Sequence, residues 1–291
     1  MDSFSGIDAD IKNYNVINLR INTSMKNNIN DPDTNCVVQL NQSRALTNVV
    51  KCDLNYVNIS NVFHNVASYN NKFELSIYDI NIGPPVTQYT VFVNVGYYTA
   101  TELAAELERV IRAIDTRLQG TTIIYQTTLK RFITSTNVFQ YFFDIEAFRG
   151  NANNVGNNFL WLFGANISTN VYRVGVSNTI TPQPPNLYGA TTVYVCSRKL
   201  ATTKSILELM NGNAGNTVSA VANEIMSLGI NSAYGVYQTY YNNGSSRGLN
   251  TFSSGFIIDE VDLQFRDQWN NILESDRQLN PIDLNFKVFY V

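Results

Sequence analysis

Histidine and cysteine are scarce in this chain of 291 residues, which holds one histidine, His64, and three cysteines, Cys36, Cys52 and Cys196. A structural zinc site usually takes four well-spaced cysteine and histidine ligands. The sequence does not supply such a set, so zinc is excluded unless aspartate and glutamate bound it. The cysteines form no CxxC pair, and their odd number leaves at least one thiol free. Buried, reduced cysteines are therefore expected, which indicates folding in a cytosol-like compartment.

Charge and long apolar runs are sparse as well. Only 15% of the residues are charged and the formal net charge is −3, so nucleic-acid binding is not expected. No apolar run approaches the roughly 18 residues that a membrane-spanning helix needs. Residues 1–6 have neither the basic nor the apolar segment of a secretory signal. We therefore expect a soluble protein that is not secreted by a signal of its own.

Asparagine and the aromatic residues are abundant instead. Asparagine occurs in runs such as 27–28, 70–71, 153–154 and 242–243, and the chain has 17 tyrosines and 16 phenylalanines. Asparagine favours turns, whereas tyrosine and phenylalanine favour strands. The composition therefore predicts an all-β protein with many loops, long enough to bury a substantial core.

One amphipathic helix is predicted, beginning at Thr99 and ending before Gly120. Thr99 and Glu102 match a capping box, in which the hydroxyl accepts the N3 amide and the carboxylate accepts the N-cap amide. Glu108 and Arg112 are four residues apart and can pair. An apolar stripe recurs at helical spacing: Leu103, Leu107, Val110, Ile114 and Leu118. We expect the helix to bury this stripe against a β scaffold and to have no cofactor role.

Alternating apolar and polar residues predict about eight strands. They lie at 36–40, 52–59, 73–80, 89–95, 192–198, once within 218–241, and at 257–266 and 284–290. Eight antiparallel strands in two packed sheets is the count of a jelly roll. The predicted fold class is all-β: a single jelly-roll β-sandwich with an inserted helix-plus-hairpin subdomain. The strand order does not follow from the sequence.

Three parts are predicted along the chain: an N-terminal arm over 1–33, a discontinuous sandwich over 34–95 and 189–291, and an inserted subdomain over 96–188. The arm lacks a core pattern, so we expect a partner to order it. The remaining local predictions are a hairpin over 121–135, a strand over 139–145, an apolar segment Phe159–Gly164 that fills the core, a strand over 234–241, and a flexible loop over 242–250. Residues 203–232 are ambiguous between helix and strand.

No catalytic, cofactor-binding or metal-binding residue is predicted. His64 is the only candidate base for a histidine triad, and a loop or strand-end position is its default interpretation. A glycosidase pair could be drawn from five carboxylates: Asp144, Glu146, Asp259, Glu260 and Asp262. Any chain of this size offers such pairs, and the last three flank a strand where a solvated edge explains them better. The protein is therefore not expected to be an enzyme.

Exposed aromatic residues offer another class of site. Tyr97, Tyr98, Tyr240 and Trp269 could form a stacking platform for a glycan in a carbohydrate-binding or attachment module without catalysis. The simpler interpretation is structural, because paired tyrosines often brace a turn and a tryptophan often covers the end of a sheet.

Several segments together resemble a protein family. In order, they are Gly96-Tyr97-Tyr98-Thr99 with Glu102-Leu103, the hairpin over 121–135, Phe142–Ile145, Leu160-Trp161-Leu162-Phe163-Gly164, Thr192–Ser197, Ile258–Asp267 and Leu284–Tyr290. This order resembles the minor capsid, or penton, proteins of virophages and Polinton-like viruses. The segment ending at Gly164 departs from the usual Leu-Leu-Gly-Phe spelling of the family. The resemblance also favours a strand within 218–230.

The resemblance implies a structural virion protein whose homopentamers close the five-fold vertices of an icosahedral capsid. Its partners would be further copies of itself and the surrounding major capsid protein, with assembly in the host cytoplasm. The arm over 1–33 would face neighbouring capsid components. A bound receptor or surface glycan does not follow from the sequence.

Overall fold

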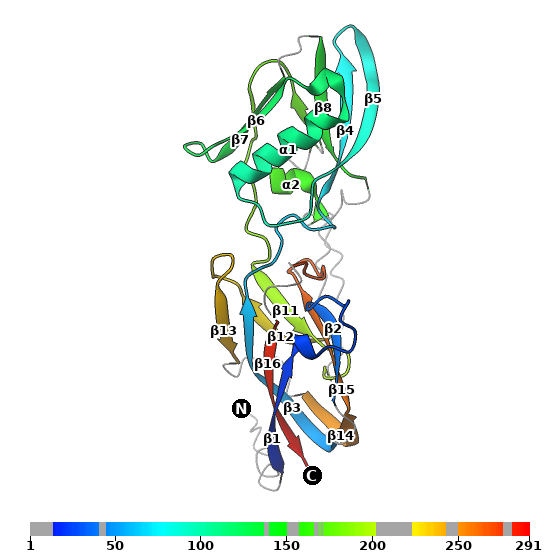
Figure 1. Ribbon diagram of the computed structural model, residues 1–291, viewed down its shortest axis with the longest axis vertical. Helices are drawn as coiled ribbons and strands as arrows, with labels where there is room; N and C mark the ends of the chain where they lie inside the picture. Colours follow the sequence, from blue (N-terminus) through cyan, green and yellow to red (C-terminus); the bar gives the residue numbers. More distant parts are fainter. Residues whose placement is uncertain are drawn as a thin grey trace, which may run out of the picture. The chain divides into compact units, whose positions relative to one another are not determined.

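The computed structural model describes residues 14–40, 45–136, 140–149, 157–165, 169, 171–201, 223–242, 250–275 and 281–291. They form two compact units: the first joins residues 1–62 to 190–291, and the second spans 63–189 (Figure 1). We call these the sandwich unit and the inserted unit. Both are built mainly from antiparallel strands, which confirms the all-β class.

The sandwich unit has two antiparallel sheets. The first has the order β1-β16-β3-β13, with β14 also paired to β3, and the second has the order β12-β11-β15-β2. The strands are β1 (Asn15–Asn22), β2 (Asn35–Gln39), β3 (Leu46–Ser60), β11 (Thr192–Cys196), β12 (Glu224–Gly229), β13 (Tyr237–Tyr241), β14 (Asn250–Ile258), β15 (Glu260–Arg266) and β16 (Asp283–Tyr290). A short 3₁₀ turn, η2 (Thr23–Met25), follows β1.

This strand order is that of a jelly roll. When the strands other than β14 are lettered B to I in chain order, the first sheet reads B-I-D-G and the second reads C-H-E-F. These are the two four-stranded sheets that two interlocked Greek keys produce. The inserted unit enters between the third and fourth of these strands, β3 (D) and β11 (E). The predicted jelly roll with an insertion is therefore confirmed.

Alternate residues of the two sheets are buried and form the core of the sandwich unit. Val261, Leu263 and Phe265 of β15 are fully buried, as are Leu284 and Val288 of β16. Their neighbours in sequence point to the opposite face, as the two-residue period of a strand requires.

Two predicted boundaries were wrong. The strands expected at 73–80 and 89–95 belong to the inserted unit, so that unit begins at residue 63 rather than 96. The eighth jelly-roll strand is instead β1, which lies in the segment expected to be an arm. Alternation shows that a segment is a strand but not which sheet it joins, and β1 was missed because Ile21 is its only fully buried apolar residue.

The inserted unit has two further sheets and two helices. One sheet has the order β5-β4-β8-β9 and the other β10-β7-β6. Their strands are β4 (Lys72–Asp79), β5 (Ile82–Phe92), β6 (Thr121–Gln126), β7 (Arg131–Thr136), β8 (Tyr141–Ala147), β9 (Val171–Val174) and β10 (Thr179–Ile180). The helices are α1 (Ala100–Ile114) and α2 (Phe159–Phe163), and the 3₁₀ turn η4 (Thr116–Leu118) follows α1. The predicted hairpin is β6 and β7.

Helix α1 begins as predicted. The Thr99 hydroxyl accepts the Glu102 amide at 3.3 Å, and the Glu102 carboxylate accepts the Thr99 amide at 2.8 Å, so the capping box is confirmed. Glu108 and Arg112 pair at 2.7 Å. Both side chains also reach the edge of β6: the Ile123 amide donates to Glu108, and Arg112 donates to the Thr121 carbonyl oxygen. The helix therefore covers this strand edge with polar side chains.

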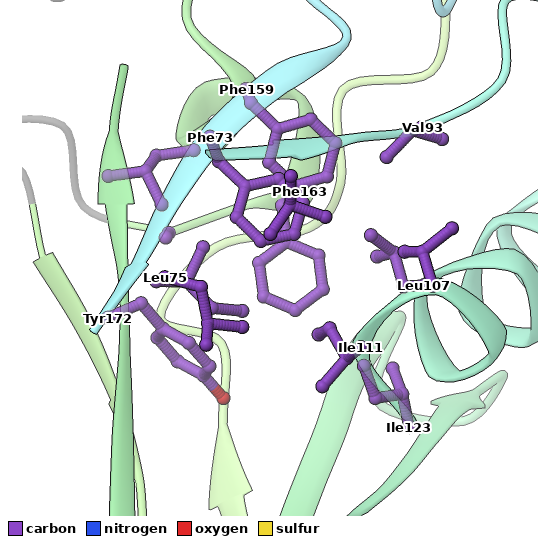
Figure 2. Packing of buried hydrophobic residues seen from close by; sticks show 14 of the residues in the cluster. Phe73, Leu75, Val93, Leu107, Ile111, Ile123, Phe159, Phe163 and Tyr172 are labelled. Carbon is purple, nitrogen blue, oxygen red and sulfur yellow. The ribbon is translucent and has the colours of Figure 1, made fainter. Parts of the chain in front are cut away.

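The apolar segment 159–163 forms the short helix α2 in the core of the inserted unit. Phe163 stacks on Phe132 with ring centroids 4.8 Å apart, and Phe159 stacks on Phe73 at 4.7 Å. Figure 2 shows Phe73, Phe159 and Phe163 in one buried cluster with Leu107 and Ile111 of α1. A solitary helix this short would not be stable, so packing maintains α2.

Some predictions lie partly outside the described residues. These are most of the ambiguous region (202–222), most of the loop over 242–250 (243–249), and the first residues of the arm (1–13). Of the ambiguous region, residues 224–229 form strand β12, in agreement with the family resemblance.

Candidate interaction surface

His64 and the cysteines lie in different units. His64 is buried in the segment between β3 and β4, where the inserted unit begins. Cys36, Cys52 and Cys196 belong to the sandwich unit and are free and buried. Burial raises the pKa of each thiol to about 12, so they are protonated at neutral pH. A thiol in this state is a poor nucleophile.

Two of the candidate glycosidase carboxylates lie on β8. Asp144 is buried and makes a bidentate salt bridge with Arg173 of β9, with both N–O distances 2.7 Å. Glu146 lies two residues on, opposite Glu74 of β4. The Arg173 guanidinium also stacks over Phe142, 4.8 Å from the ring centroid. This cluster ties neighbouring strands together.

The other three carboxylates lie in the sandwich unit, around the start of β15. Asp262 accepts the Ser197 hydroxyl at 2.7 Å and the amides of residues 198 and 199. Asp259 and Glu260 lie beside Lys199. These carboxylates are thus engaged around the turn after β11. The five candidate carboxylates are divided between the two units, two in the inserted unit and three in the sandwich unit.

The four candidate stacking aromatics are also divided. Tyr97 and Tyr98 precede α1 in the inserted unit, where the Tyr98 hydroxyl donates to the Asn94 carbonyl oxygen. Tyr240 and Trp269 belong to the sandwich unit and are half-buried. The Tyr240 hydroxyl donates to Gln238. Tyr98 and Tyr240 therefore make hydrogen bonds within their own units, and neither unit contains all four aromatic residues.

A different aromatic surface emerges on the outer face of the sheet β1-β16-β3-β13. Tyr241 of β13 lies opposite Tyr56 of β3, and their rings meet edge to face with centroids 6.2 Å apart. Tyr237 lies on the same face, and Tyr237 and Tyr241 are 53% and 67% exposed. With Arg20 of β1 and Asp283 of β16, these residues make what we call the tyrosine face.

Arg20 and Asp283 supply the charge of the tyrosine face. The guanidinium makes two hydrogen bonds to the carboxylate, at 2.8 and 2.9 Å. Asp283 is buried and also accepts from Asn58 at 3.2 Å, whereas the Arg20 side chain is 69% exposed. Burial and the Asp283 carboxylate raise the pKa of Tyr237. Exposed tyrosine and arginine are enriched at protein interfaces.

Sequence reasoning missed the tyrosine face although one signal was present. Tyr237 and Tyr241 are four residues apart in a predicted strand, so both point to one face, and Tyr240 points to the other. The contribution of Arg20 depends on pairing between residues more than 260 positions apart, which no local pattern reveals.

The described ranges contain neither a cluster of metal-ligating side chains nor a membrane-spanning helix. In this part of the chain, no group of three or more histidine, cysteine, aspartate or glutamate side chains is placed to hold a metal ion. No helix among the described residues is long and apolar enough to cross a membrane.

Comparison with known proteins identifies the fold. No protein-family model and no curated protein sequence matches the chain. Among solved structures, the mavirus penton protein matches with a TM-score of 0.50 at 11% sequence identity, over 96% of this chain and 99% of that one. A chain of the Sputnik virophage structure matches with a TM-score of 0.44 at 13% identity, over 94% and 98%. The chain therefore shares the fold of the mavirus penton protein over nearly its whole length, which confirms the resemblance to virophage penton proteins at the level of fold.

Proposed function

We propose that this chain is a minor capsid (penton) subunit that forms homopentamers at the five-fold vertices of an icosahedral capsid. The observation that carries the proposal is the extent of the match to the mavirus penton protein, which includes both the jelly roll and the inserted unit. A jelly roll alone is used for many functions. A match that extends over 96% of this chain, inserted unit included, and over 99% of the other chain is a much narrower likeness.

The surface chemistry is compatible with this role. A five-membered ring is a closed heterologous assembly, in which one face of each subunit meets a different face of its neighbour. Such contacts favour aromatic and arginine side chains over a densely charged surface. Only 15% of the residues are charged, and the tyrosine face presents two exposed tyrosines beside an arginine. We propose that this face contributes to a contact in the capsid, with further copies or the major capsid protein as the partner.

The proposal is tested by the solution mass of the purified full chain. Light scattering across a range of protein and salt concentrations should detect a species of five times the 32.7 kDa chain mass. Electron microscopy of the same sample should show five-fold rings. A chain that stays monomeric at all concentrations, and is not incorporated when the major capsid protein assembles around it, contradicts the proposal.

A glycan-binding attachment module without catalysis is the alternative that the sequence left open. Its discriminating result is binding to a glycan array by a chain that remains monomeric. The aromatic residues expected to form its platform are divided between the two units, so the structure provides no specific observation in its favour.

A further inference from the structure

Strand β1 lies at the edge of its sheet. It pairs with β16 over all eight residues without a register shift. Within the described part of the chain, no strand pairs with its other side. An open edge is a template for another strand, and proteins usually block it with proline, a bulge or several charges. β1 has no proline and no bulge, and its single charge, Arg20, is paired with Asp283.

The apolar side of β1 is also incompletely covered. Ile17, Leu19 and Ile21 lie opposite the buried Val288, Phe286 and Leu284, so all three face the sandwich core. Their burial decreases toward the N-terminal end of the strand: Ile21 is 1% exposed, Leu19 is half-buried and Ile17 is 40% exposed. One more strand at this edge would cover Ile17 and Leu19 and extend the core.

The sequence just before β1 has the pattern of such a strand. Residues 7–12 read Ile-Asp-Ala-Asp-Ile-Lys, with apolar residues at 7, 9 and 11 alternating with charged residues. In a strand, Ile7 and Ile11 would lie on one face and Asp8 and Asp10 on the other. With the isoleucines toward the core, the aspartates would lie on the same outer face as Arg20. Both faces of this segment therefore complement β1.

We propose that residues 7–12 of one copy add as an edge strand to β1 of a neighbouring copy in the assembled ring. The inference rests on the proposed homopentamer and names one of its contacts. Main-chain hydrogen bonds would provide affinity, and the alternating side chains would fix the register, as in other cases of β-strand addition.

Pairing within one chain is disfavoured by the connection. Only Asn13 and Tyr14 separate Lys12 from Asn15. A two-residue hairpin loop of type I′ needs positive φ at both central residues. Asparagine tolerates that conformation, but a bulky residue such as tyrosine rarely adopts it. A neighbouring copy is free of this constraint, so it is the occupant that the chain favours.

Disulfide trapping between two single variants of the full chain tests the proposal. One variant carries Asp8→Cys or Asp10→Cys, and the other carries Asn18→Cys on the outer face of β1. The two are mixed, assembled and mildly oxidised, and the native cysteines do not interfere because they are buried. We expect a linked dimer with one copy of each variant. Ser227→Cys, at an exposed position of β12, replaces Asn18→Cys as the matched control and should not be linked.

A second measurement removes the apolar face of the segment. The ring formed by the double variant Ile7→Ser, Ile11→Ser should dissociate at a concentration roughly tenfold or more above that of the wild-type ring. Ser3→Ala with Ser5→Ala, just outside the segment, should leave it unchanged.

The outcomes separate this inference from the proposed function. The inference is overturned, and the pentamer remains supported, if the wild type forms rings, the cysteine variants do not cross-link and the isoleucine variant assembles like the wild type. A cross-link that forms only within a single chain carrying Asp10→Cys and Asn18→Cys overturns it in favour of a hairpin. A wild-type chain that neither assembles nor cross-links contradicts both.

Discussion

Single residues at helix ends and in turns contribute measurable stability to the inserted unit. Thr99 is the clearest case, because its hydroxyl and the Glu102 carboxylate satisfy two amides that the first turn of α1 leaves unpaired. Thr99→Ala should lower the free energy of unfolding by about 1 kcal/mol. Thr101→Ala, at an exposed position in the same turn, should leave it unchanged or slightly higher, since alanine favours helix. Equal losses in urea unfolding of the two variants would refute the capping role.

Asp115 gives stability a dependence on pH. It accepts from Arg117 at 2.6 and 2.9 Å and from the Tyr89 hydroxyl at 2.8 Å. Arg117 holds the pKa of Asp115 well below its ordinary value of 3.8. A carboxyl group with a lowered folded-state pKa stabilises the fold above its unfolded pKa, and that contribution is lost as the pH falls.

Asp115→Asn should therefore cost about 1–3 kcal/mol at neutral pH. Its difference from the wild type should shrink as the pH falls below about 4. Urea unfolding of both proteins at pH 7 and pH 3 measures this, and a difference that is the same at both values would show that Asp115 acts through shape rather than charge.

At the scale of elements, α2 is the central packing element of the inserted unit. Phe163 is fully buried and contacts the rings of Phe132, Phe159 and Tyr172. Gly164 ends the helix at φ 82°, where an added Cβ would lie 2.4 Å from the Gln183 carbonyl oxygen. The segment thus needs aromatic residues in the helix and glycine at its end.

Phe163→Ala should cost about 3–5 kcal/mol through the cavity that it leaves. Hydrogen exchange of the full chain is the appropriate measurement, because it reports the protection of the amides in each of the two compact units separately. Amides of β4 and β8 should lose protection, whereas those of β3 and β16 should keep it. Phe92→Ala, at a residue that is 55% exposed, should change neither set. Equal loss in both units would contradict their separate stability.

The sequence predicted elements better than it predicted their partners. The capping box, the β6–β7 hairpin and the C-terminal strand all follow from local spacing, which the structure reproduces. The stripe of α1 is reproduced as far as Ile114, where the helix ends earlier than predicted, and Leu118 lies in the 3₁₀ turn η4. The assignment of β4 and β5 to the sandwich was wrong, because Phe73 and Val91 have the same alternation whichever core buries them. Strand β1 was missed for the opposite reason: its edge position leaves most of its side chains exposed.

At the scale of the whole molecule, the tyrosine face could not be predicted from the sequence, because it depends on which strands pair and which of their faces is exposed. Tyr240 was selected from the sequence, yet Tyr237 and Tyr241 are the exposed pair. The alternation of a strand puts Tyr240 on one face of β13 and Tyr237 and Tyr241 on the other. It does not say which of these faces is toward the core. Arg20 and Asp283 required the fold itself, since β1 and β16 are at opposite ends of the sequence.

If the tyrosine face contributes to the contact between copies, Tyr241→Ala should raise the concentration at which the pentamer dissociates. A loss of about 1–2 kcal/mol, typical of an interface tyrosine, corresponds to roughly a 5–30-fold change. Tyr188→Ala, at a residue that is 83% exposed in the inserted unit, is the matched control and should have no effect. Sedimentation velocity of the two variants provides the comparison, and equal effects would remove the tyrosine face from the contact.

The solution mass of the full chain is the decisive measurement of whether its copies assemble into a ring of five. We expect a species of five times 32.7 kDa whose share grows with protein concentration, together with five-fold rings in electron micrographs. A mass of one chain at every concentration, with no incorporation into vertices in the presence of the major capsid protein, would contradict it.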